Sequence, residues 1–229
     1  MSKVENTGAS RLYKRLGYSI ADEYTRNCEG DGLSVSTGCV KSWDNSLAMT
    51  AKRRTKVAKR GATSSQEPQI IDMPSQNMAV VYSKGDPNEV GPQVMPALYG
   101  SVYTLRFGLK KKGVDFKIGA LRARWPDAHI VPKNQWTGIW GLPIPDEVTV
   151  LPQKISGVEV KREVWQYGTV AQILHIGPFS TEMPTVQRLH DFIAENGYEV
   201  AGAHEEEYLT TPKAKVQKTL IRYPIRKSR

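Results

Sequence analysis

The sequence predicts an α+β fold. A strand–helix–strand–strand unit occurs twice, and the two copies form one antiparallel sheet with two helices on one face and a ligand groove between the halves. The first observation is an internal repeat, because "AVVYSKGDPNEVGPQV" (79–94) aligns without gaps with "AQILHIGPFSTEMPTV" (171–186). Each copy has an apolar strand, a glycine turn and a proline-started helix. The second observation is that two strand-like segments follow each helix. Their hairpin-like returns favour antiparallel pairing, because parallel neighbours would need a crossover connection.

Composition divides the chain into a leader and a folded domain. The first 66 residues show little sustained periodicity and run into the polar, proline-containing segment "GATSSQEPQ". We therefore expect a disordered basic leader and linker over residues 1–66 and an ordered domain over 67–229 that begins near "IIDMP". The two halves of this domain cover roughly 70–150 and 160–229.

In the first half, an apolar stripe at three- and four-residue steps predicts a helix over roughly 92–112. Three lysines in its last turn and Gly113 directly after them suit a helix C-terminus. Strands are expected at "FKIGALRARW" (116–125) and "WTGIWGLPI" (136–144). The residues of the stripe are Met95, Leu98, Val102, Leu105 and Leu109.

In the second half, a shorter stripe predicts a helix over roughly 183–195, and Asn196-Gly197 ends it. Strands are expected at "YEVAGAHEEEYL" (198–209) and "VQKTLIRYPI" (216–225). The residues of this stripe are Val186, Leu189 and Ile193.

The formal net charge of +9 is concentrated in the leader. Residues 1–66 carry 12 Lys and Arg against 6 Asp and Glu, whereas residues 67–229 carry 20 against 17. A short basic run such as "AKRRTKVAKRG" (51–61) is usually a solvated tail, and the alternative is a contact with nucleic acid or a membrane surface. The leader is short and lacks a helix-turn-helix, which argues against a nucleic-acid partner.

The sequence indicates a cytoplasmic protein with no membrane partner. No apolar run approaches the ~18 residues of a membrane span, and the N-terminus lacks the apolar region of a secretory signal. Both cysteines, Cys28 and Cys39, lie in the leader at a spacing that fits no metal motif.

Strong catalytic motifs are absent from the sequence. "GLKKKG" lacks the spacing of a phosphate-binding loop, there is no HExxH motif, and the four histidines are scattered. We therefore expect no cofactor and no metal. The remaining signal is a carboxylate among aromatic residues.

The segment "GAHEEEYLTTP" (202–212) contains this carboxylate. Strand alternation puts His204, Glu206 and Tyr208 on one face of the sheet. Glu205 and Glu207 fall on the other face, where they would simply meet water. Glu206 is therefore placed between two rings.

A second strand supplies further aromatic residues. In "WTGIWGLP", alternation places Trp136 and Trp140 on one face, with Gly138 leaving space between the indoles. Two core tryptophans are the plain alternative. In the repeat, however, this strand and the Glu206 strand would occupy equivalent places and meet across the groove. Aromatic walls around a desolvated carboxylate suit a flat, cationic or amphipathic molecule.

Several separated segments resemble the GyrI-like small-molecule-binding domains, and in particular their stand-alone bacterial branch. In the second half these are "VAQILHIGPF", "PTVQRLHDFIAENGY", "GAHEEEYLTTP" and "KTLIRYPI"; in the first half they are "ALYGSVYTLRF" and "WTGIWGLPIPD". The resemblance covers about residues 70–228 and excludes the leader.

The resemblance implies a duplicated strand–helix–strand–strand (SHS2-type) fold that binds diverse amphipathic, often cationic compounds in a groove. It also implies that some members of the branch hydrolyse cyclopropane-bearing natural products, while others, fused to DNA-binding modules, act as drug-sensing activators. The family's pocket glutamate falls on Glu206 and its tyrosine on Tyr208, for which pocket and core positions both stay open. Its pocket aromatics fall on Trp136, Trp140, Tyr99 and Tyr103. Glu205 departs from the family pattern, where histidine is common, and its outward direction predicts little consequence.

Two functions fit these residues. The first is a drug-sequestering or resistance protein that binds amphipathic, cationic aromatic molecules, with His204 beside Glu206 among the ligand-binding residues. The second is a hydrolase of cyclopropane-bearing electrophiles in the same groove. In that enzyme Glu206 would deprotonate water and the hydroxyl of Tyr103 or Tyr208 would protonate the leaving group.

Overall fold

The computed structural model describes residues 65–128 and 130–229. The expected disordered leader therefore lies outside the described residues, apart from its last two positions. The first described strand covers Gln69–Met73.

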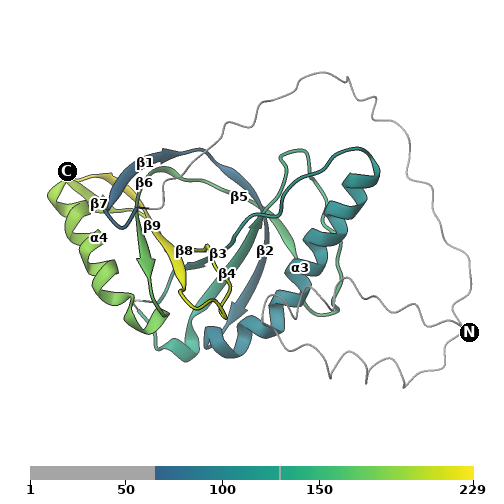
Figure 1. The fold of residues 1–229 in the computed structure, drawn as a ribbon, viewed down its shortest axis with the longest axis horizontal. Coiled ribbons are helices and arrows are strands. Elements are labelled where there is room, and N and C mark those ends of the chain that lie inside the picture. The colour runs from purple at the N-terminus through teal and green to yellow at the C-terminus, as the bar shows by residue number, and fades with distance from the viewer. Residues whose placement is uncertain (1–64, 129) are drawn as a thin grey trace, which may run out of the picture. The chain divides into compact units, whose positions relative to one another are not determined.

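The described residues form an antiparallel α+β fold, which confirms the predicted class (Figure 1). Two α-helices are described, and neither is long and apolar enough to cross a membrane. The helices are α3 (Pro87–Lys111) and α4 (Met183–Glu195), with short 3₁₀ turns η1 (Lys133–Gln135) and η2 (Phe179–Thr181). The strands are β1 (Gln69–Met73), β2 (Gln76–Lys84), β3 (Leu121–Trp125), β4 (Thr137–Pro143), β5 (Lys161–Trp165), β6 (Gly168–Ile176), β7 (Tyr198–Val200), β8 (His204–Tyr208) and β9 (Lys218–Lys227).

The two predicted units are joined at the middle of the sheet. The strand order is β1-β6-β9-β8-β3-β4-β2-β5, so the first unit contributes β3, β4 and β2, and the second contributes β8, β9 and β6. The contact between units is the β3–β8 pair, in which Ala123 lies directly opposite Glu206. The short strand β7 pairs with β9 away from this path.

Two strands that the repeat does not contain, β1 and β5, hold the ends of the sheet together. β1 pairs with β6 at one end of the sheet, yet only residues 74–75 separate it from β2 near the other end. β5 pairs with β2, yet only residues 166–167 separate it from β6. The sheet is therefore strongly curled, and the face opposite the helices is folded on itself. A core of side chains from both ends fills that face, namely Met78, Val80, Trp165, Tyr167 and Val170.

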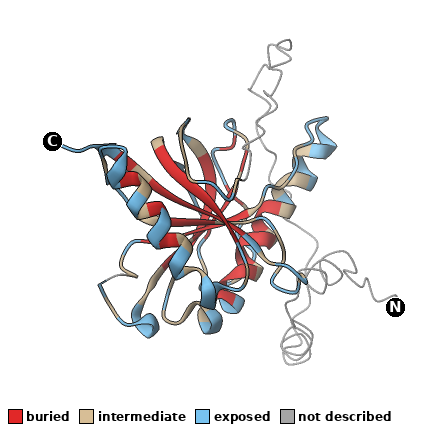
Figure 2. Cartoon of the chain, turned by 60° about the vertical axis from the view of Figure 1, so that its left-hand side comes forward, coloured by how far each residue is buried: buried red, intermediate tan, exposed pale blue. Residues whose placement is uncertain are grey.

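Each helix covers its own half of the sheet with the stripe that the sequence predicts (Figure 2). In α3, Met95, Leu98 and Val102 are buried, and the last two members of the stripe are partly buried. In α4 all three stripe residues are buried. The two helix-side cores therefore follow from helical periodicity.

The first helix begins five residues earlier than expected. Its first residue is Pro87, and the side chain of Asp86 accepts a hydrogen bond from the backbone N–H of Asn88. Pro92, which we took as the helix start, lies inside the helix. An aspartate cap followed by proline at the first helical position is the stronger start signal, and it was present in the sequence.

The strand boundaries also differ from the expected ones. The segment 116–125 is strand only from Leu121, and the segment 198–209 is two strands, β7 and β8, rather than one. The break contains Gly202, where a Cβ atom would lie 2.8 Å from the Pro224 ring. The backbone passes too close to β9 at this point for a regular ladder with side chains.

Candidate functional site

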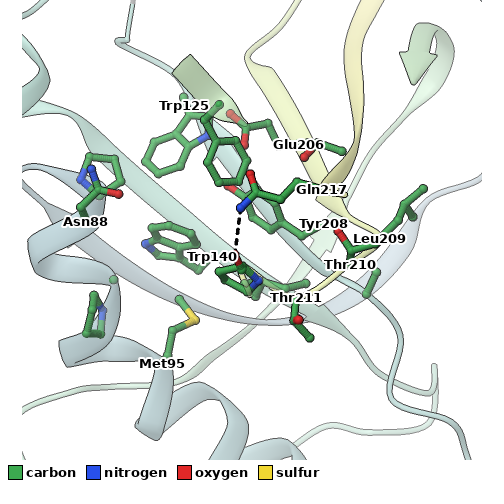
Figure 3. A pocket seen from close by; sticks show the side chains of 18 of the residues that line it. Asn88, Met95, Trp125, Trp140, Glu206, Tyr208, Leu209, Thr210, Thr211 and Gln217 are labelled. Atoms are coloured by element: carbon green, nitrogen blue, oxygen red, sulfur yellow. Dashed lines mark hydrogen bonds between the residues drawn. The ribbon is translucent and has the colours of Figure 1, made fainter. Parts of the chain in front are cut away.

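A large cavity opens on the helix side of the sheet, between α3, the strands β3, β4 and β8, and the segment before α4 (Figure 3). Its volume is about 990 Å³, which is at the upper end for small-molecule sites. All but one of the predicted site residues line it: Tyr99, Tyr103, Trp136, Trp140, Glu206 and Tyr208.

Three indoles form an aromatic wall of this cavity: Trp125, Trp136 and Trp140. The Trp125 and Trp140 rings meet edge to face at 4.9 Å, and the Trp125 and Trp136 centroids are 5.7 Å apart. Hydrogen bonds hold two of the three indoles in place, because Trp140 Nε1 donates to Ser83 Oγ and Trp136 Nε1 donates to the Val131 carbonyl. These two indoles are therefore positioned before any ligand arrives.

Gly138 is necessary for this arrangement. A Cβ atom there would lie 2.7 Å from Ser83 Oγ, 2.8 Å from Trp140 Nε1 and 3.0 Å from the Trp125 ring. From the sequence we expected Gly138 to leave an open space between Trp136 and Trp140. In the structure, the indole of Trp125 and the hydrogen-bonded Trp140–Ser83 pair fill that space.

The predicted equivalence of the Trp140 strand and the Glu206 strand is wrong, although both strands line the cavity. β8 is the first long strand after its helix, so its counterpart is β3, which is also its direct partner. The counterpart of β4 is β9. The sequence analysis therefore missed Trp125, which alternation along β3 places on the same face as Ala123, opposite Glu206.

Tyr208 belongs to both the pocket and the core. It lines the cavity and packs against the core on the α3 side. Its ring lies 6.4 Å from Trp140 and meets Phe179 edge to face at 5.6 Å. The two positions that the sequence left open for Tyr208 are therefore compatible.

Glu206 lies at the cavity and is only 6% exposed. Its Oε1 atom is 3.2 Å from Nε2 of His204, whose Nδ1 atom is 2.7 Å from the Tyr223 hydroxyl. In one tautomer the Tyr223 hydroxyl donates to Nδ1 and Nε2 donates to Glu206. His204 is not among the residues that line the cavity, and it contacts the lining residue Glu206 instead.

A second carboxylate, Glu182, reaches the same place from the end of η2. It also lines the cavity, and ligand atoms of Glu182, His204 and Glu206 all lie within 4.8 Å of one another. Burial raises the pKa of Glu182 to about 7, and the nearby Glu206 carboxylate adds to the rise while His204 opposes it. The sequence analysis missed Glu182, because a glutamate just before a helix belongs to no motif of the cavity.

On the face opposite the cavity, Glu205 is buried and Glu207 is only partly exposed, and this corrects our expectation that both simply meet water. Glu205 is 1% exposed. It accepts hydrogen bonds from Arg124 Nε at 2.8 Å and from the Tyr167 hydroxyl at 3.0 Å. Arg222 Nη1 lies 3.3 Å from Glu205 and 2.6 Å from Glu207. Alternation gave the right faces, but the curl of the sheet buries the second face.

The cavity can therefore do two things chemically. The aromatic wall can hold a flat apolar body, and two carboxylates can pair with a cation or accept a proton. Within the described part of the chain, Glu182, His204 and Glu206 are also the one group whose ligand atoms lie close enough to hold a metal ion.

Comparisons with known proteins identify the family of the chain. A sequence model described as "GyrI-like small molecule binding domain" matches residues 66–226. No curated protein matches the chain. Among solved structures, an uncharacterized conserved protein from Listeria innocua has 27% sequence identity and a TM-score of 0.62, covering 72% of this chain and 94% of that one.

Two further structures extend the comparison. A hydrolase from Listeria innocua has 25% identity and a TM-score of 0.60, covering 74% of this chain and 96% of its own. The C-terminal domain of EcmrR has 13% identity and a TM-score of 0.51, covering 70% and 98%, which shows a shared fold alone.

Proposed function

The chain belongs to the family of GyrI-like small-molecule-binding domains, and on that premise we propose that it binds amphipathic, cationic aromatic molecules in the cavity described above. In this proposal it acts as a cytoplasmic sequestering or resistance protein. Glu206 is the central charge, and the aromatic wall with Tyr99, Tyr103 and Tyr208 holds the body of the ligand.

The observation that carries this proposal is a buried carboxylate next to three indoles at one cavity. A buried charge without a strong partner costs free energy, and a cationic ligand would remove this cost. Ring faces attract the same cation, by about 1–2 kcal/mol when water is excluded. Charge and rings therefore favour the same class of ligand.

A titration with one cationic aromatic dye and a neutral compound of the same outline tests the proposal. Glu206→Gln keeps the shape of the side chain and removes its charge. We expect this change to weaken binding of the dye by about 2–5 kcal/mol and to affect the neutral compound much less. The matched control is Glu147→Gln, because Glu147 is exposed and is not among the residues that line the cavity. That control is expected to change affinity by no more than a few tenths of a kcal/mol.

Hydrolysis of cyclopropane-bearing electrophiles is the second candidate function. It is favoured by the similarity to hydrolases from Listeria innocua over about three quarters of this chain. In this reaction Glu206 would take a proton from water as the oxygen attacks a ring carbon. The strained C–C bond would break toward its electron-accepting substituent, which the hydroxyl of Tyr103 or Tyr208 would protonate. Return of the proton from Glu206 to the tyrosine would complete the addition of one water.

Mass analysis separates the two candidates. The protein is incubated with a cyclopropane-bearing alkylating compound, and the product is examined for the added mass of one water. Turnover by the native protein that is lost in Glu206→Gln would support the hydrolase. Binding without any product would leave sequestration as the function.

A further inference from the structure

The cavity contains two carboxylates from separate elements, and only one was expected. Glu206 comes from β8 and Glu182 from the segment just before α4. We propose that these two residues, the carboxylate pair, select ligands whose cationic group is a primary or secondary ammonium rather than a fully alkylated one. This inference rests on the proposed function and makes it narrower.

The first observation concerns one carboxylate oxygen of Glu182. Glu182 Oε2 is buried and has no hydrogen-bond partner among the described residues. A buried acceptor without a donor is costly, and only an N–H or O–H group can satisfy it. The methyl groups of a quaternary ammonium carry positive charge but supply no such donor. An ammonium with N–H groups supplies both.

The second observation is the distance between the oxygen atoms of the two carboxylates. One tetrahedral ammonium that donates to two oxygens at about 2.8 Å holds them about 4.6 Å apart. The ligand atoms of Glu182 and Glu206 lie within 4.8 Å of each other, so one nitrogen can reach both. A trimethylammonium group places carbon between its nitrogen and any oxygen, at C···O distances of about 3.3–3.6 Å. It cannot approach both carboxylates as closely.

The third observation concerns His204, whose two ring nitrogens both have hydrogen-bond partners. His204 contacts Glu206 with one ring nitrogen and Tyr223 with the other. The ring of Tyr223 in turn packs edge to face on His190 at 4.7 Å. Both ring nitrogens of His204 therefore have partners, whereas Glu182, which lines the cavity, has one oxygen without a hydrogen-bond partner among the described residues. Glu182 is the residue that would distinguish one cationic group from another.

The test is calorimetric titration of the full-length protein with three naphthylethyl ligands that share one aromatic body. These ligands end in a primary amine, a trimethylammonium group or a hydroxyl group, and a chelator is present throughout. The native protein is expected to bind the primary amine at least 10-fold more tightly than the trimethylammonium ligand. Glu182→Gln and Glu182→Leu should remove most of this preference, by weakening the amine at least 10-fold and the trimethylammonium ligand less than 3-fold. Glu147→Gln should change neither value.

The outcomes separate this inference from the function on which it rests. Equal affinity for the two cations, or an equal loss for both in the Glu182 variants, would overturn the inference and leave the proposed function standing. Failure of both cations to bind would overturn the two together. A parallel titration with Zn²⁺, without chelator, tests the alternative that Glu182, His204 and Glu206 hold a metal ion. Stoichiometric Zn²⁺ binding that excludes the amine and is lost in Glu182→Gln would replace the ammonium site by a metal site.

Discussion

Glu205 and Glu206 are adjacent in the sequence, but the compensation of their charges differs. Glu205 accepts from Arg124 and Tyr167 and lies close to Arg222, so its charge is neutralised within the fold. Glu206, in contrast, pairs with one nitrogen of His204 at 3.2 Å. A carboxylate that the fold itself neutralises serves stability, whereas one that the fold leaves short of partners is available to a ligand.

This difference predicts opposite effects of two equivalent substitutions. Glu205→Gln removes the buried anion that pairs with Arg124 and one of the two carboxylates beside Arg222, so it should lower the free energy of unfolding by about 3–5 kcal/mol. Glu206→Gln should change it by less than about 1 kcal/mol. Urea unfolding of both variants measures these changes. Equal free energies of unfolding of the two variants would show that the ion pairs of Glu205 do not stabilise the fold more than the contacts of Glu206 do.

Glu182 gives the cavity a pH dependence near neutrality. Its carboxyl group loses its charge below its pKa of about 7, so the affinity for an amine should fall as the pH drops from about 8 to about 6, at most 10-fold per unit for one proton. His204 and Glu206 on β8 lie beside this group, and Tyr223 on β9 is close enough to interact with it. Titrations of native protein and Glu182→Gln across this range measure the effect. An identical slope in the variant would show that Glu182 does not set the pH dependence.

At the residue scale, the sequence could predict on which face of the sheet a side chain lies, but not which residues surround it there. A two-residue period is a local property, so the shared face of His204, Glu206 and Tyr208 was predictable. The burial of Glu205 depends on Arg222, which lies opposite it on the neighbouring strand β9, and on Tyr167, and both are distant from it in the sequence. Glu182 meets Glu206 for the same reason, and no local pattern marks it.

At the scale of elements, β4 shows how closely backbone and indoles pack. The absence of a side chain at Gly138 lets Trp125 and Trp140 meet edge to face. Gly138→Ala would place a methyl group less than 3 Å from Ser83 Oγ and Trp140 Nε1. The variant should be less stable by about 1–3 kcal/mol, as in other overpacked cores, and should bind aromatic ligands more weakly because the wall shifts.

Gly119→Ala provides a milder comparison for this prediction. A Cβ atom at Gly119 would approach the Pro143 side chain at 3.1 Å and no indole. Thermal melts and tryptophan emission spectra of the two variants measure the difference. An unchanged emission spectrum and unchanged ligand affinity in Gly138→Ala would mean that the wall does not depend on this glycine.

The helices were more predictable than the strands, for a physical reason. The stripes of α3 and α4 repeat every three to four residues, and that pattern needs no knowledge of the partner. β1 and β5 are short segments outside the repeat, and their pairing is with β6 and β2 respectively. Strand propensity depends strongly on what a strand packs against, so segments without a visible partner are easily missed.

At the scale of the whole molecule, the two halves of the sequence exchange strands. β1 precedes the first unit in the chain but pairs with β6 of the second, over five residue pairs from Gln69–Gln172 to Met73–Gly168. β5 precedes the second unit but pairs with β2 of the first. The repeat is therefore a property of the central strands, and the outer strands join the copies.

This exchange makes the halves mutually dependent. A cut between residues 150 and 160 would leave β1 without β6, β5 without β2, and the central strands β3 and β8 as open edges. It would also separate Arg124 from Glu205, which breaks an ion pair between a partly buried cation and a buried anion. Open edges and unpaired charges favour association over folding in a fragment of this size. Fragments 67–150 and 160–229, expressed separately, should be unfolded or self-associating by circular dichroism and size-exclusion chromatography. Expressed together, they should copurify as a complex that binds the same aromatic cation as the intact chain. A monomeric fragment that unfolds cooperatively alone would show that the repeat is a pair of independent domains and that the curl of the sheet is not required for folding.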